Sequence, residues 1–83
     1  MTEQQLNHEL GQRIRTIRKA RKIRQGDVAK SIRMTRVSIV NIEKGRTNVL
    51  TWRLAQMAVV FGVEPWQIMH PDWRMLCGTI PQP

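Results

Sequence analysis

The sequence predicts an all-α fold: a compact domain of five helices followed by a short irregular C-terminal tail. Apolar residues recur in steps of three and four along most of the chain, which is typical of helices with one buried face. Single glycines, Gly45 and Gly62, follow two of these stretches, where helices commonly end. The 83 residues suffice for one small domain. We assign a disordered N-terminus to residues 1–5, the helical domain to 6–69 and the tail to 70–83.

The first helix is expected from about Gln5 to Arg21. Its apolar positions follow helical spacing, and they are Leu6, Leu10, Ile14, Ile17 and Ala20. Its other faces carry basic residues, namely Arg13, Arg15, Lys19 and Arg21. A basic amphipathic helix can lie on an anionic membrane. We favour packing against the rest of the domain, because the apolar stripe is narrow and the chain has other helices to receive it.

The stretch over residues 25–44, QGDVAKSIRMTRVSIVNIEK, predicts two short helices joined by a tight turn. Val28, Ala29 and Ile32 share one face at helical spacing, and so do Ile39 and Ile42. Two helices that each bury one side, with a polar and partly cationic side left on the second, form a helix-turn-helix. Thr35 is placed to cap the second of these helices, and Gly45 is its expected left-handed stop.

A fourth helix is expected over residues 51–61, and Pro65 opens a short fifth helix. The fifth helix and the tail carry more apolar surface than they can bury alone. The tail either folds back over the core or meets a second copy, and we favour the second copy. The expected dimer contacts are Trp66, Met69, Trp73 and Leu76.

Charge divides the chain into two parts. Residues 13–46 hold 12 basic and 2 acidic residues, whereas the remainder holds 2 basic and 4 acidic. This distribution favours a polyanion as partner on one side and a core or protein partner on the other. The alternative is a solvated basic face that only aids solubility.

Several classes of protein are disfavoured by what the sequence lacks. A single cysteine, Cys77, excludes an internal disulfide and a cysteine-built metal site, and His8 and His70 do not complete a metal-ligand spacing. We expect no enzyme, metal or cofactor, because the carboxylates are scattered and no nucleophile has a base beside it. The longest apolar run, residues 57–63, is too short to cross a membrane. The polar start is unlike a signal peptide, so we expect a cytoplasmic protein.

The stretch over residues 25–44 resembles the DNA-binding unit of the phage-repressor/Cro-like (XRE-like) helix-turn-helix family. It matches the family at Gln25, at the small fifth residue Ala29, in its apolar set and in the closing Ile-Glu-Lys-Gly of residues 42–45. The resemblance covers about residues 10–69 and implies a lambda-repressor-like fold. One position departs from the family, because Arg33 stands where the turn usually has glycine. A left-handed side chain there costs about 1–2 kcal/mol.

The resemblance implies that the helix at 36–44 enters a groove of double-stranded DNA. Arg36 can donate two hydrogen bonds to guanine, Val37 suits a thymine methyl and Asn41 suits adenine. The candidate base contacts are Thr35, Arg36, Val37 and Asn41. The candidate phosphate contacts are Arg24, Gln25, Ser38, Lys44, Arg46 and Asn48. For each candidate base contact the alternative is a phosphate contact or plain exposure to solvent. For Gln25, Lys44 and Arg46 the alternative is exposure to solvent.

The resemblance also places Arg18 against Glu43, as a buried structural ion pair between the first helix and the recognition helix. An isolated buried charge is costly, so each residue would need the other. The alternative is that Arg18 is one more exposed arginine that contacts phosphate.

These features predict a sequence-specific, DNA-binding transcriptional regulator without enzymatic activity. We expect a repressor that binds a palindromic operator as a homodimer, with no membrane role. One alternative is an antitoxin-like protein that binds a protein partner through its tail and also binds its own promoter. Another is a nucleic-acid or membrane-surface binder that depends on charge alone.

Overall fold

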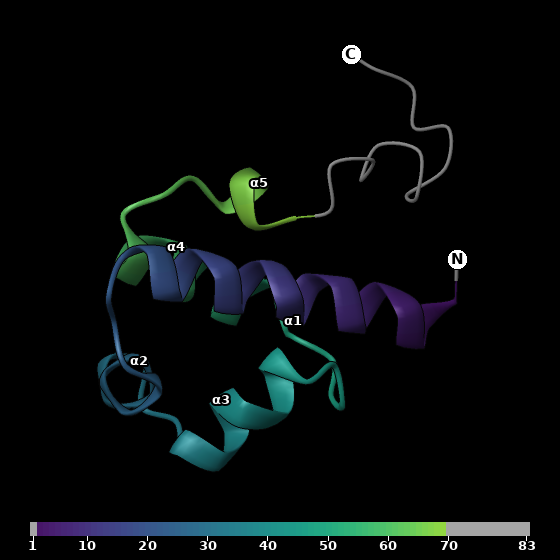
Figure 1. Cartoon of the computed structure of the whole chain (residues 1–83), viewed down its shortest axis with the longest axis horizontal. Coiled ribbons are helices and arrows are strands. Elements are labelled where there is room, and N and C mark those ends of the chain that lie inside the picture. Colours follow the sequence, from purple (N-terminus) through teal and green to yellow (C-terminus); the bar gives the residue numbers. More distant parts are fainter. Residues whose placement is uncertain (1, 70–83) are drawn as a thin grey trace.

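The computed structural model describes residues 2–69 and contains five helices in this part of the chain. They are α1 (Glu3–Ala20), α2 (Gln25–Ser31), α3 (Arg36–Glu43), α4 (Thr51–Phe61) and α5 (Pro65–Ile68). In Figure 1 the long α1 crosses the middle of the molecule, with α2 and α3 on one side of it and α5 on the other. The predicted all-α, five-helix fold is confirmed. Within the described residues, no helix combines the length and apolar character that crossing a membrane requires.

The helix α1 begins earlier than its apolar spacing predicts, because a capping box defines its first turn. The Thr2 hydroxyl accepts a hydrogen bond from the Gln5 backbone N–H at 3.1 Å, and the Gln5 side chain accepts one from the Thr2 N–H at 2.8 Å. These two bonds satisfy backbone donors that a helix start leaves free. The expectation of a disordered N-terminus over 1–5 is therefore wrong for residues 3–5, which are helical, and Met1 lies outside the described residues.

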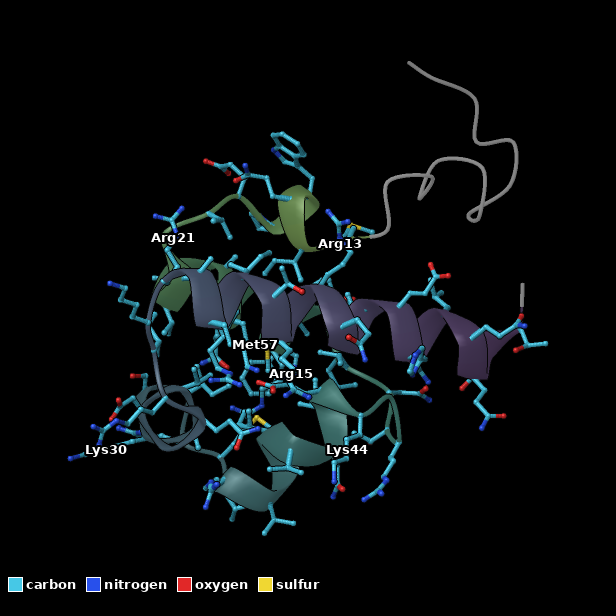
Figure 2. All side chains as sticks on the ribbon, viewed as in Figure 1. Arg13, Arg15, Arg21, Lys30, Lys44 and Met57 are labelled. Atoms are coloured by element: carbon cyan, nitrogen blue, oxygen red, sulfur yellow. The ribbon has the colours of Figure 1, made fainter. Side chains whose placement is uncertain are left out.

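One apolar core joins all five helices. The side chains of Ile14, Val28, Ile39, Met57 and Ile68, one from each helix, are completely buried. Figure 2 shows Met57 beneath α1, on the side where α2 and α3 lie. Complete burial of one such side chain contributes about 1.5–3 kcal/mol. The core therefore holds four short helices, α2 to α5, against the longer α1, and none of these four would be stable alone.

The helices α1 and α3 approach closely because Gly11 has no side chain. A β-carbon built at Gly11 would lie 2.7 Å from the Glu43 carbonyl oxygen, and closer still to that of Ile42. Gly45, which follows α3, has a φ of 72°. A β-carbon built at Gly45 would overlap the backbone of His8 in α1. Two glycines thus let the C-terminal end of α3 lie directly on α1.

Each of the first four helices ends with the same pair of backbone hydrogen bonds. A residue with positive φ follows each helix, and the next residue donates back to a carbonyl five positions earlier. These positions are Lys22 (φ 57°), Arg33 (φ 56°), Gly45 (φ 72°) and Gly62 (φ 70°). At Arg33 the two bonds are Met34 N–H to the Ala29 carbonyl (2.8 Å) and Arg33 N–H to the Lys30 carbonyl (3.4 Å). The turn thus keeps the geometry that glycine would give, although an arginine occupies it.

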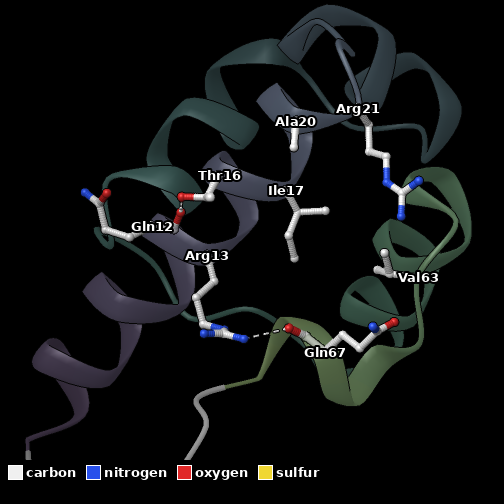
Figure 3. Close-up of a pocket in the computed structure, with 8 residues that line it drawn as sticks. All are labelled: Gln12, Arg13, Thr16, Ile17, Ala20, Arg21, Val63 and Gln67. Carbon is white, nitrogen blue, oxygen red and sulfur yellow. Dashed lines mark hydrogen bonds between the residues drawn. The ribbon is translucent and has the colours of Figure 1, made fainter.

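The short helix α5 is attached to α1 through Arg13. The Arg13 guanidinium donates from Nε to the Ile68 carbonyl (3.1 Å) and from Nη2 to the Gln67 carbonyl (2.9 Å). These bonds satisfy carbonyls at the C-terminal end of α5. A groove runs beside this contact between α1 and the segment entering α5, with Ile17 and Val63 on its walls (Figure 3). Arg13, predicted only to lie outside the apolar stripe of α1, therefore has a structural contact.

We predict that Gly11→Ala destabilises the fold, because its new methyl group would overlap the backbone of α3. Overpacking of this kind costs about 1–3 kcal/mol in the free energy of unfolding. Gly26→Ala is the matched control, since nothing lies within 4 Å of a β-carbon there. The control should be unchanged or more stable by up to about 1 kcal/mol. Urea denaturation of both variants measures this, and equal stability would contradict the close approach.

We predict that Arg33→Gly stabilises the protein by about 1 kcal/mol, because glycine adopts a positive φ without the steric cost of a β-carbon. The expected result is a higher melting temperature with an unchanged circular dichroism spectrum. Arg33→Ala is the control, since it removes the charge and retains the β-carbon. If alanine stabilised as much as glycine, the gain would come from charge and not from the backbone.

Candidate nucleic-acid interface

A buried ion pair joins α1 to α3. Arg18 donates from Nε to Glu43 Oε2 at 2.7 Å and from Nη2 to Glu43 Oε1 at 3.1 Å. The two residues are only 8% and 4% exposed. Two parallel hydrogen bonds between a guanidinium and a carboxylate fix orientation as well as distance. The ion pair expected between Arg18 and Glu43 is thus present in the structure.

Two further hydrogen bonds extend this pair to α2. Arg18 Nη1 donates to the Ile23 carbonyl at 2.9 Å, in the connection between α1 and α2. Gln25, the first residue of α2, donates from its amide to Glu43 Oε1 at 3.2 Å. The Gln25 side chain, expected to contact phosphate, thus donates a hydrogen bond within the protein. The network therefore joins α1, α2 and α3.

The first turn of α3 presents the candidate base contacts. The Thr35 hydroxyl accepts a hydrogen bond from Ser38 N–H at 3.1 Å and lies 2.9 Å from the Ser38 hydroxyl, so both side chains serve the helix cap. Arg36 is exposed and Val37 is 68% exposed, while Asn41 lies one turn further along and is half-buried. Arg36 and Val37 are thus exposed at the start of α3, and Val37 and Asn41, four residues apart, lie on the same side of the helix.

Cationic side chains flank this surface on both sides. On one side an open hollow is lined by Arg15, Arg18, Arg24, Gln25, Asp27 and Arg36. On the other, exposed Lys44 and Arg46 follow α3, and Asn48 accepts a hydrogen bond from the side chain of Asn7. Figure 2 shows Arg15 and Lys44 on the α3 side of α1, whereas Arg13 and Arg21 lie on the opposite side.

Arg15 was not among the predicted DNA contacts, although it lines the hollow beside Arg24 and Arg36. A local signal existed, because Arg15 lies three residues before Arg18 and so shares a face with it. Gly11 was also missed. Its significance lies in the backbone of α3, more than thirty residues away, and no pattern within α1 points to it.

The predicted dimer contacts are only partly within the described residues. Trp66 is 59% exposed and Met69 is half-buried against the core, while Trp73 and Leu76 lie outside the described part. Among residues 2–69 the structure shows no cluster of three or more side chains that could hold a metal ion.

Solved structures with the same arrangement of helices include several regulators. The restriction-modification controller protein C.AhdI from Aeromonas hydrophila superposes with a TM-score of 0.73 at 25% identity, over 76% of this chain and 96% of that one. The DNA-binding domain of BldD gives a TM-score of 0.73 at 25% identity, over 84% and 100% of the two chains. A hypothetical transcription factor from Neisseria, NHTF, matches in fold with a TM-score of 0.74 at 24% identity, over 93% and 90%. A comparison with curated proteins found no match.

The fold, with its exposed and cation-flanked α3, defines a helix-turn-helix DNA-binding regulator of XRE/Cro-like type. Proteins of this class are transcription factors and not enzymes. Residues 9–67 match the model of the helix-turn-helix domain family, and the chain belongs to that family.

We predict that breaking the buried ion pair on one side is much more costly than removing it altogether. Arg18→Met leaves the Glu43 carboxylate buried without its cation, which should cost about 3–5 kcal/mol in the free energy of unfolding. The double variant Arg18→Met/Glu43→Leu should recover most of this loss, because apolar side chains of similar volume can replace a buried pair. Denaturant titration of the two variants and the parent protein measures the difference. A double variant as unstable as the single one would show that the pair itself is not what Arg18 supplies.

Proposed function

We propose that this protein is a transcriptional repressor that recognises a defined operator through α3. The observation that supports this most directly is the exposure of Arg36 and Val37 at the start of α3, with the half-buried Asn41 one turn after Val37. A guanidinium, an apolar methyl surface and a carboxamide match the major-groove edges of guanine, thymine and adenine, respectively. Occupation of promoter DNA would then block transcription.

The charges around α3 suit the DNA backbone. Arg15 and Arg24 line the hollow beside Arg36 at the start of α3, and Lys44 and Arg46 follow the end of α3. Contacts to phosphate set the position and register of a protein on the duplex, whereas contacts to base edges carry sequence discrimination. We therefore propose Arg24, Gln25, Ser38, Lys44, Arg46 and Asn48 as phosphate contacts, with Arg15 added to them.

We further propose that two copies bind a palindromic site. An exposed tryptophan, Trp66, with the half-buried Met69 beside the same short helix, offers apolar surface to a partner. A symmetric dimer would place two copies of α3 about 34 Å apart, which is one turn of B-DNA. The setting would be the cytoplasm, where such DNA is accessible.

The test begins with selection of bound duplexes from a random pool, followed by competition against random duplex at physiological salt. A specific site should be preferred by about 10³-fold or more. We predict that Arg36→Ala/Val37→Ala/Asn41→Ala abolishes this preference without loss of the fold, since none of the three side chains is fully buried. A variant that stays folded and still discriminates would overturn the proposal.

The control for this experiment is Lys44→Ala/Arg46→Ala. Loss of two phosphate contacts should weaken binding to all sequences alike and reduce the slope of log K against log salt by about 2. The preference for the selected site should persist in this control. If the preference were also lost, Lys44 or Arg46 would contribute to sequence discrimination, and the proposed division between base and phosphate contacts would be wrong.

A further inference from the structure

The arginine of α4, Arg53, contacts the turn between α2 and α3. Its Nη1 donates to the carbonyl of Ile32, the C-cap residue that follows α2, and also to the Gln56 side chain at 3.2 Å. Its guanidinium carbon lies 4.1 Å from the centroid of the Trp52 ring, a stacking distance. Trp52 itself is 53% exposed. The Trp52 ring and the Gln56 side chain thus hold the Arg53 guanidinium where it donates to the Ile32 carbonyl.

The carbonyl that Arg53 binds belongs to the peptide group that joins Ile32 to Arg33. The backbone of Arg33 has the costly left-handed conformation. The carbonyls of Val28, Ala29 and Lys30 accept hydrogen bonds from the backbone of the turn itself. The Ile32 carbonyl instead receives its hydrogen bond from a side chain of α4. A charged donor therefore fixes this peptide group from outside the helix-turn-helix.

The orientation of this peptide group determines the direction in which the chain enters α3. Only Arg33, Met34 and Thr35 separate it from Arg36, the first residue of α3. A rotation of the peptide group would therefore move the exposed surface of α3 relative to α1 and α2. Contacts to base edges depend on side-chain placement to within a fraction of an ångström.

We propose that Arg53 is a positioning residue for DNA recognition: stacked on Trp52, it holds the strained turn in the geometry that directs α3 toward the bases. This inference rests on the proposed function. Its rival is that Arg53, as a cation near the interface, contacts a phosphate directly. The two roles differ in what they do to sequence preference and to salt dependence.

The experiment compares Arg53→Met and Trp52→Ala with the parent protein on the selected operator and on random duplex. All proteins are measured at a temperature where circular dichroism shows them fully folded. Arg21→Met is the matched control, because it removes one exposed cation on the side of α1 opposite α3 (Figure 2). Arg53→Lys retains the charge and one donor but does not reproduce the planar stack.

Both Arg53→Met and Trp52→Ala should lower operator affinity about tenfold or more relative to random duplex, because each well-made base contact supplies roughly that factor in discrimination. The salt slope on random duplex should match that of Arg21→Met, and Arg53→Lys should fall between Arg53→Met and the parent. Amide chemical shifts of Arg33 and α3 should move in both variants, while those in the first half of α1 should not.

Two outcomes would overturn the inference. One is an operator preference within twofold of the parent in both Arg53→Met and Trp52→Ala. The other is equal weakening on both duplexes with a smaller salt slope in Arg53→Met alone, which identifies a phosphate contact. Failure of the proposed function is seen separately, because the parent protein would then prefer no duplex in the selection.

Discussion

The contact between Arg18 and Glu43 places a directional constraint on the structure that apolar packing alone does not supply. A buried guanidinium and carboxylate must meet in one geometry or leave uncompensated charge. Because Arg18 lies on α1 and Glu43 is the last residue of α3, their two parallel hydrogen bonds set the register between these helices. Gly11 makes this register accessible, since a side chain at that position would hold α3 away from α1.

This constraint matters because α3 is too short to be a rigid element on its own. Eight residues lie well below the length at which an isolated helix is stable in water. Its shape comes from the Thr35 cap at one end, from Ile39 and Ile42 in the core, and from Glu43 at the other end. The surface proposed to read bases is therefore as precise as the packing beneath it, and core variants should affect recognition as well as stability.

Apolar spacing and turn residues were sufficient to predict the five helices, and α4 begins and ends where expected. The start of α1 was missed because its signal is polar: Thr2 and Gln5 form a capping box outside the apolar stripe. The roles of Arg13 and Arg53 could not be predicted, because their acceptors are backbone carbonyls 54–55 and 21 residues away. A pattern within one helix identifies the face of a side chain, but it does not identify a carbonyl that the fold brings to that face.

The positive charge of this chain has two separate uses, and only one of them concerns DNA. Arg13, Arg18 and Arg53 donate to carbonyls or to a carboxylate inside the molecule, where they join α5, α3 and the α2–α3 turn to other helices. Arginine suits this work because its planar fork can satisfy several acceptors at once without losing its charge. The salt dependence of DNA binding reflects only the cations that neutralise phosphates. The net charge of +8 therefore overstates the electrostatic part of binding, and in our proposal the internal arginines affect DNA recognition only through the placement of α3.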